Sequence, residues 1–240
     1  MTASENCASS VRRAGALHIG VNMSMIRGIA PNNFMAEAQA TINLYVKPGL
    51  GNERSVEVYD KTSSKYDEYT GAWDYSGPTY AARTMGELFP EQKQRDNFRF
   101  LDVAAGTGLV GTEMKKLGFQ NLDALDPSKG MLDVARERGI YTTYYQDYIG
   151  DDKLDIKDDA YDSIVMCGGM GVNMVPCSGF REMIRIVRPG GYIVNVTRPE
   201  NMENNDYIGR PQPMFENLEK EGHWKLVSQK IVRNYLRGKD

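Results

Sequence analysis

A glycine-rich turn that directly follows a short apolar run constrains the fold of this chain most. Residues 98–108 read FRFLDVAAGTG, so that one acid, Asp102, interrupts the apolar run and Gly106 and Gly108 close it. Glycine lets a ligand approach the backbone where a Cβ atom would block it, and a helix that begins there presents free N–H groups to that ligand. The pattern therefore predicts a buried strand, a ligand-binding turn and a helix.

A second short strand ends in a carboxylate. Residues 122–126 read LDALD, and Asp126 at the end of this run is placed to accept hydrogen bonds from ribose hydroxyls. The glycine turn and this carboxylate together predict a nucleoside pocket.

Two classes of nucleoside ligand compete for that pocket. Residues 106–111, GTGLVG, match the GxGxxG pattern of a nucleotide-dependent oxidoreductase, which binds the pyrophosphate of NAD or FAD. Asp102, however, precedes the turn, where a second carboxylate would repel a pyrophosphate but would suit an ammonium group. S-adenosyl-L-methionine carries an ammonium and a sulfonium group and no phosphate. The wider D-x-x-x-G-x-G pattern therefore favours S-adenosyl-L-methionine, and the dinucleotide stays open as the alternative.

The composition limits the partners. The chain has 240 residues, of which 41% are hydrophobic, which suits one domain plus an extension. A formal net charge of −3 argues against nucleic-acid binding, because that affinity comes largely from clustered Lys and Arg. A small molecule or a protein is therefore the expected partner. Three cysteines and two histidines without paired spacing predict neither a disulfide framework nor a metal site.

The chain is expected to be cytoplasmic. No apolar run approaches the roughly 20 residues that cross a bilayer, so no membrane partner is predicted. Residues 1–36 contain three arginines, several serines and one acid, which faintly resembles an organelle transit peptide. A flexible tail is the preferred interpretation of this segment, and the oligomeric state is not predicted.

The order of elements predicts the fold class. From Phe98 onward short strands alternate with helices, which is typical of a Rossmann-like, doubly wound α/β fold with a mostly parallel sheet and helices on both faces. The predicted α/β domain spans residues 56–240 and opens with an aromatic-rich helical lid, residues 56–97. Residues 1–55 form an N-terminal extension of unassigned structure.

Several motifs taken together resemble the class I S-adenosylmethionine-dependent methyltransferases, a family with a seven-stranded sheet. These motifs are DVAAGTG at 102–108, Asp126, Asp147 and RPGG at 188–191. Further matches resemble the methyltransferase-like proteins encoded in the human Williams-Beuren deletion region: YD at 59–60, KYD at 65–67, GLVG at 108–111, VPC at 175–177 and Trp224. The resemblance covers about residues 56–236.

The resemblance implies where the methionine and ribose parts of the cofactor bind. It places Gly106 and Gly108 against them, with Asp102 beneath the turn and Asp126 at the ribose. Tyr66 resembles the N-terminal helix tyrosine that closes over the methionine end in relatives.

The same resemblance implies the adenine site. Met131 lies against the adenine face, and Asp147 accepts a hydrogen bond from the adenine amino group, with Tyr148 after it. An ordinary solvated loop acid is an equally good interpretation of Asp147. The expected set of cofactor-binding residues is completed by Ala104, Thr107 and Cys167. Cys167 is interpreted as a small buried residue rather than a nucleophile, because no neighbour in the sequence would lower its thiol pKa.

The acceptor atom is not assigned. Residues 167–173, CGGMGVN, lack the Asn/Asp-Pro-Pro-aromatic signature of the amino methyltransferases that act on nucleic acids and some proteins. No general base is identified either, so catalysis is expected to rest on positioning the acceptor for in-line displacement. The sequence predicts a methyltransferase for a small molecule. A non-catalytic module that binds S-adenosylmethionine and docks a protein partner stays open.

The N-terminal segment carries one further prediction. Only four residues follow Leu236, so the strand that completes the family's terminal antiparallel hairpin is expected to be missing. Thr41–Lys47 alternates apolar and polar side chains, which is typical of a half-buried strand. We predict that it joins the sheet beside residues 224–236. The alternatives are a loose tail or a helix that continues from Phe34 to Ala40.

Overall fold

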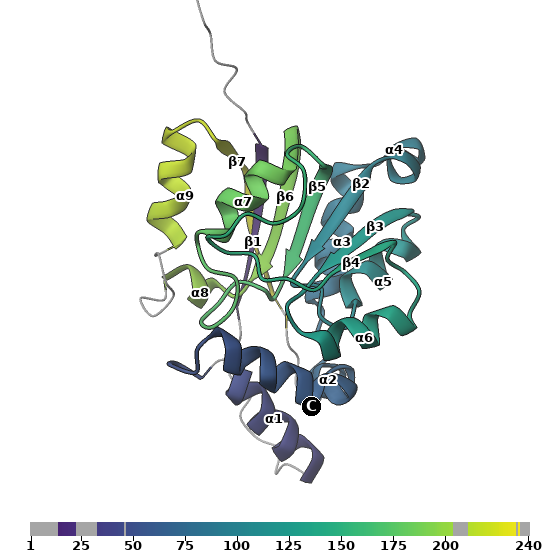
Figure 1. Ribbon diagram of the computed structural model, residues 1–240, viewed down its shortest axis with the longest axis vertical. Helices are drawn as coiled ribbons and strands as arrows, with labels where there is room; N and C mark the ends of the chain where they lie inside the picture. The colour runs from purple at the N-terminus through teal and green to yellow at the C-terminus, as the bar shows by residue number, and fades with distance from the viewer. Residues whose placement is uncertain (1–13, 23–32, 46, 204–210, 234, 236–240) are drawn as a thin grey trace, which may run out of the picture.

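A parallel sheet forms the centre of the molecule (Figure 1). The computed structural model describes residues 14–22, 33–45, 47–203, 211–233 and 235. Within these residues seven strands follow the order β4-β3-β2-β5-β6-β1-β7, and each neighbouring pair is parallel. In that order the strands are Thr143–Tyr145, Asn121–Leu125, Arg99–Val103, Tyr161–Cys167, Val187–Thr197, Ala14–Asn22 and Trp224–Arg233. The predicted Rossmann-like, doubly wound fold is confirmed.

Helices cover both faces of the sheet because the strands alternate their side chains. In β2, Leu101 and Val103 belong to one buried apolar cluster, whereas Phe100 belongs to the cluster on the opposite face. Helices α3, α5 and α6 contribute to the face of Phe100, and α7 and α9 contribute to the other. These helices are Gly77–Leu88, Leu109–Lys116, Lys129–Glu137, Gly179–Ile186 and Pro211–Lys220. The short helices α4, Gln92–Asn97, and α8, Pro199–Glu203, lie between elements.

The sheet includes an N-terminal strand, but not the predicted one. Strand β1, Ala14–Asn22, lies between β6 and β7 and runs parallel to both. Thr41–Lys47 is not a strand: the chain up to Tyr45 belongs to helix α1, Asn33–Tyr45. The buried residues Ala38, Thr41 and Tyr45 follow helical spacing, which outweighs an alternation of only seven residues. The helix considered as an alternative is therefore correct.

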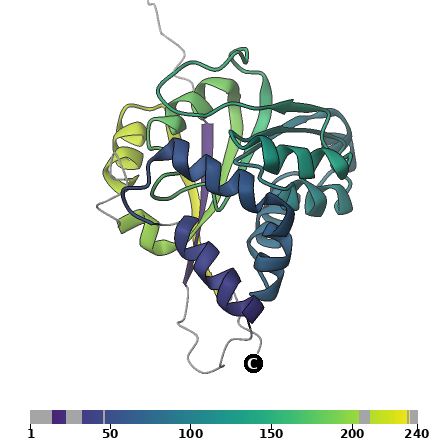
Figure 2. The ribbon, with the colours of Figure 1, turned by 60° about the horizontal axis from the view of Figure 1, so that its bottom comes forward.

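Two N-terminal helices lie across the carboxyl ends of the strands. Figures 1 and 2 show α1 and α2, Asn52–Ala72, crossing this edge of the sheet. The chain winds outward from β2 through β3 to β4 and then returns to β5 on the other side of β2. The carboxyl ends of β2 and β5 thus form the switch point at which parallel α/β sheets bind ligands.

Candidate functional site

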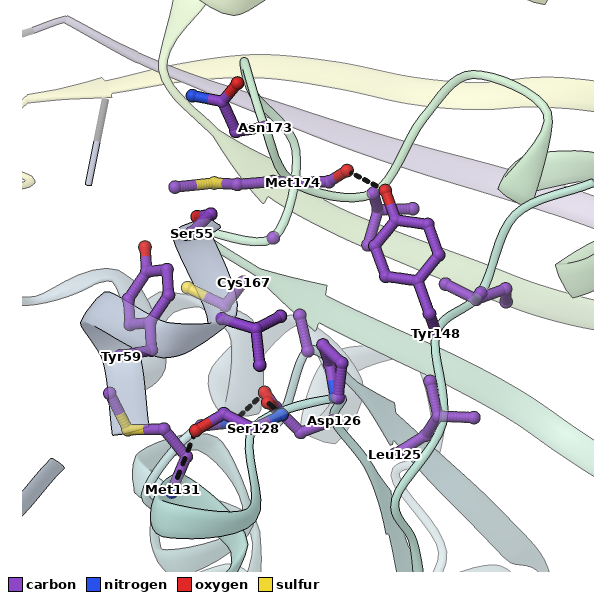
Figure 3. A pocket seen from close by; sticks show the side chains of 18 of the residues that line it. Ser55, Tyr59, Leu125, Asp126, Ser128, Met131, Tyr148, Cys167, Asn173 and Met174 are labelled. Carbon is purple, nitrogen blue, oxygen red and sulfur yellow. Dashed lines mark hydrogen bonds between the residues drawn. The ribbon is translucent and has the colours of Figure 1, made fainter. Parts of the chain in front are cut away.

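A cavity of about 700 Å³, open at its mouth, lies at the switch point beneath α2 (Figure 3). Its walls come from the turns that follow β2, β3 and β5, from α2, and from residues 148–149. In Figure 3, Asp126, Ser128 and Met131 lie along one side, and Tyr59 and Tyr148 approach from opposite sides. The size and mixed polarity fit a small organic ligand.

Gly106 leaves the backbone of the turn open to the cavity. Its φ is +55°, and a Cβ atom added there would meet no atom within 4 Å. A Cβ at Gly169, which also lines the cavity, would instead lie 2.6 Å from the Cβ of Ala104. Gly106 lines the cavity, and the open space over it allows the close approach of a ligand to the backbone.

Asp126 joins two of the turns. Its Oδ2 accepts a hydrogen bond from the backbone N–H of Gly106 at 2.8 Å, and its Oδ1 accepts from that of Ser128 at 2.9 Å. Burial raises the pKa of this carboxyl group to about 6, while these two hydrogen bonds act in the opposite direction. A carboxylate offers about four lone pairs, so each oxygen retains capacity for a ligand hydroxyl.

Helix α2 is fastened to the site by two aspartates one heptad apart. Asp60 accepts hydrogen bonds from the Ser128 hydroxyl at 2.6 Å and from the Gly130 N–H at 2.8 Å, both at the start of α6. Asp67 accepts a 2.6 Å hydrogen bond from the Thr107 hydroxyl and pairs with Arg138. These contacts hold α2 over the glycine turn and over α6.

Seven of the eleven predicted site residues line the cavity: Tyr66, Ala104, Gly106, Asp126, Met131, Tyr148 and Cys167. Four do not. The Thr107 hydroxyl faces Asp67 rather than the cavity, and a Cβ at Gly108 would pack against Tyr141. Asp147 is exposed and accepts a hydrogen bond from the backbone N–H of Tyr148.

Asp102 lies on the other face of β2. It is buried, and its Oδ2 accepts a 2.6 Å hydrogen bond from the Tyr141 hydroxyl, while Oδ1 has no hydrogen-bond partner. Burial raises the pKa of Asp102 to about 7. Because side chains alternate along a strand, Asp102 shares the face of Phe100, under the turn and away from the cavity.

A second cavity of about 1080 Å³, which includes its mouth, adjoins the first. The two cavities share four lining residues: Tyr59, Tyr66, Gly168 and Met174. Tyr75, from the predicted aromatic-rich segment 56–97, also lines the second cavity, and its hydroxyl lies 3.3 Å from Cys167 Sγ. Burial raises the thiol pKa of Cys167 to about 12, so this sulfur stays protonated at neutral pH.

Sequence reasoning missed the two aspartates of α2 and the second cavity. A signal was available, because the Tyr-Asp pairs at 59–60 and 66–67 repeat after seven residues and so share one side of a helix. Within the described residues, no helix is long and apolar enough to cross a membrane, and no three His, Cys, Asp or Glu side chains gather as a metal site would require.

Several known proteins are similar to this chain over part of its length. A family model described as a methyltransferase domain matches residues 100–191. The chain is 28% identical over 186 residues to human methyltransferase-like protein 27, covering 77% of this chain and 74% of that protein. It is 34% identical over 147 residues to a demethylmenaquinone methyltransferase from Clavibacter sepedonicus, covering 57% of this chain and 55% of that enzyme. Among solved structures, a SAM-dependent methyltransferase from Leishmania major aligns with a TM-score of 0.45 at 15% identity, over 81% and 75% of the two chains.

These matches confirm the resemblance seen in the motifs and decide between the two nucleoside ligands. The domain match begins in β2 and ends in β6, so it contains the glycine turn and Asp126. The chain is similar to the class I S-adenosylmethionine-dependent methyltransferases over its methyltransferase domain, and the cofactor that this similarity implies is S-adenosyl-L-methionine.

Proposed function

We propose that this protein transfers a methyl group from S-adenosyl-L-methionine, bound in the first cavity, to a small-molecule acceptor. The observation that carries the proposal is the open backbone at Gly106, next to the buried carboxylate of Asp126 in the same cavity. The planar adenine of the cofactor needs a flat apolar wall. Its ribose needs an acceptor for the hydroxyl hydrogen bonds, and its cationic methionine part needs negative charge. Met131 and Asp126 supply these features on one side of the cavity.

The residues that hold the cofactor in this proposal are those that line the first cavity. Asp126 accepts the ribose hydroxyls, Met131 packs against the adenine, and Tyr66 covers the methionine end from α2. Thr107, Gly108 and Asp102 support the turn from behind. Asp147 is exposed, and its role at the adenine amino group remains a prediction of the resemblance.

Positioning is the main catalytic contribution in this proposal. When bound, the cofactor supplies an electrophilic methyl group on a sulfonium sulfur. The protein's part is to exclude water with α2 and to hold the acceptor in line, and preorganisation of this kind reaches about 7 to 11 kcal/mol in favourable intramolecular cases. Tyr59 and Tyr66, which line both cavities, are the side chains placed to orient the two ligands.

A small-molecule acceptor is supported by the shape of the site. The second cavity lies between α1, α2, the loop after β5 and the end of β6, and a concave site of this kind suits a small organic molecule. One relative is named as an enzyme that methylates demethylmenaquinone, itself a small molecule. The cytoplasmic location predicted from the sequence belongs to the same proposal.

Two measurements test the function. Calorimetry should show binding of S-adenosylhomocysteine and none of NADH; the reverse result would favour the oxidoreductase. Metabolite profiling with isotope-labelled S-adenosylmethionine and a lysate of the source organism should then reveal a labelled small molecule, absent with the Asp126→Ala variant. Binding of S-adenosylhomocysteine without any labelled product would instead support the non-catalytic module.

A further inference from the structure

The second cavity has the opposite charge from the first. Among the described residues that line the first cavity, Asp126 is the only acidic side chain, and none is basic. Among those that line the second, Arg198 is the only charged side chain. It follows Thr197, the last residue of β6, and is partly buried. A cation therefore lies at a cavity that several tyrosines line, next to a cavity that suits a cationic cofactor.

Five tyrosines line the second cavity. Tyr45 stacks on Tyr59 with ring centroids 4.2 Å apart, which joins α1 to α2. Tyr75 and Tyr235 meet edge to face at 4.9 Å, and Tyr235 is held there because its carbonyl oxygen accepts a hydrogen bond from the Ser76 N–H at 3.0 Å. Flat rings on several sides favour a planar ligand.

Two tyrosine hydroxyls of this cavity can donate hydrogen bonds. The Tyr75 and Tyr235 hydroxyls lie 3.0 Å apart, and a Cβ at Gly168 would lie 2.9 Å and 3.4 Å from them, so both reach the wall that the two cavities share. Burial raises the pKa of both tyrosines well above the usual value, so they remain protonated at neutral pH. Protonated hydroxyls and a guanidinium group stabilise negative charge and remove no proton from a ligand.

We propose that the second cavity binds the methyl acceptor as a planar aromatic anion, a phenolate or an aromatic carboxylate, whose charge is held by Arg198 and the hydroxyls of Tyr75 and Tyr235. This inference rests on the proposed function and specifies its substrate class.

The anionic acceptor also removes the need for a general base. Methyl transfer breaks the bond between the methyl carbon and the sulfonium sulfur, whose electron pair stays on sulfur, and forms a bond from a lone pair of the acceptor oxygen. The positive charge of the sulfonium and the negative charge of the acceptor cancel, and no proton has to leave. This agrees with the second cavity, where no His, Lys, Asp or Glu side chain occurs among the described lining residues.

Binding of matched probes tests the charge preference without turnover. Protein saturated with S-adenosylhomocysteine is titrated by calorimetry with 2-naphthoate, with its neutral isostere 2-naphthamide, and with 4-nitrophenolate as the phenolate arm. We expect at least one of the two anions to bind about tenfold or more tightly than 2-naphthamide, as a charge-assisted hydrogen bond predicts. The anion that binds more tightly identifies the charged group of the acceptor.

Variants assign the effect to Arg198. Arg198→Gln should weaken the anion about tenfold and abolish its advantage over 2-naphthamide, and Arg198→Lys should restore part of it. Arg83→Gln is the matched control, since Arg83 lies exposed on α3 and pairs with Glu87. Failure of both anions to bind, or equal anion affinity in the wild type and Arg198→Gln, overturns the inference. If S-adenosylhomocysteine itself does not bind, the proposed function fails first, so the two failures are distinguishable.

Discussion

A pair of glycine substitutions separates backbone strain from ligand binding. Gly106 and Gly139 both have positive φ, +55° and +61°, and a Cβ atom at either position meets nothing within 4 Å. An alanine in this left-handed region costs about 1–2 kcal/mol. For a domain of this size that cost lowers Tm by about 2–8 °C. Gly106→Ala and Gly139→Ala should therefore be destabilised alike, because neither methyl group clashes with the protein.

The two variants should differ only when the ligand is present. Gly106 lines the first cavity, whereas Gly139 follows α6 and does not. S-adenosylhomocysteine at a hundred times its Kd stabilises the protein that binds it by about 2.7 kcal/mol. The wild type and Gly139→Ala should therefore gain about 5–11 °C in Tm, and Gly106→Ala should lose most of this gain. Gly106→Val, with a branched side chain in the same space, should lose all of it.

Thermal unfolding followed by circular dichroism, with and without S-adenosylhomocysteine, provides the measurement. The far-UV spectrum before heating shows that each variant is folded. Equal ligand-induced shifts in Gly106→Ala and Gly139→Ala would refute the reasoning, because the open space over Gly106 would then not be where the cofactor lies.

Four further changes test other parts of the structure. Asp126→Ala should weaken S-adenosylhomocysteine by about 1.5–3 kcal/mol in calorimetry, since the ribose loses a charged acceptor; unchanged affinity would exclude Asp126 from the site. Asp67→Asn removes the ion pair between α2 and Arg138 at the end of α6, so dissociation of S-adenosylhomocysteine should become about fivefold faster in stopped-flow measurements. Asp133→Asn, on the exposed side of α6, is the control and should leave the dissociation rate unchanged. Burial raises the folded pKa of Asp102 to about 7, above its unfolded value, so this residue's contribution to the free energy of unfolding is greatest below about pH 4 and is lost as the pH rises through 7. Asp102→Asn should remove that loss in urea unfolding at several pH values, and parallel pH profiles would contradict it. Deletion of residues 1–22 should lower Tm and solubility, because β6 and β7 lose the strand between them; unchanged values would show that β1 adds nothing to the sheet.

The parts of the site that the sequence predicted well are local in the chain. A strand, a glycine turn and a helix follow one another within residues 98–116, so propensity and glycine conformation suffice to predict them. Asp126 ends the next strand of the same sheet, and parallel neighbours bring their carboxyl ends together. The position of Gly106 beside Asp126 therefore follows from the order of elements alone.

The parts that were missed depend on tertiary structure. Nothing in residues 14–22 alone specifies insertion between β6 and β7, because strand pairing at long sequence separation depends on which neighbours remain unpaired. Thr41–Lys47 was wrongly predicted as a strand, since a short alternation cannot be told from a helix without its packing partners. Asp102 was expected to suit an ammonium group of the ligand, although its alternation with Leu101 and Val103 directs its side chain to the face opposite theirs.

Helix α2 links the two cavities through a single seven-residue repeat. Seven residues are close to two helical turns, so Tyr59 and Tyr66 lie on one side of the helix and Asp60 and Asp67 on the adjacent side. The aspartates bind the start of α6 and the glycine turn, and the tyrosines thereby line both cavities. A rigid shift of α2 that released the aspartates would therefore also move the tyrosines in the walls of both cavities. In the proposed function, helix α2 therefore forms part of the cofactor site and of the acceptor site at once.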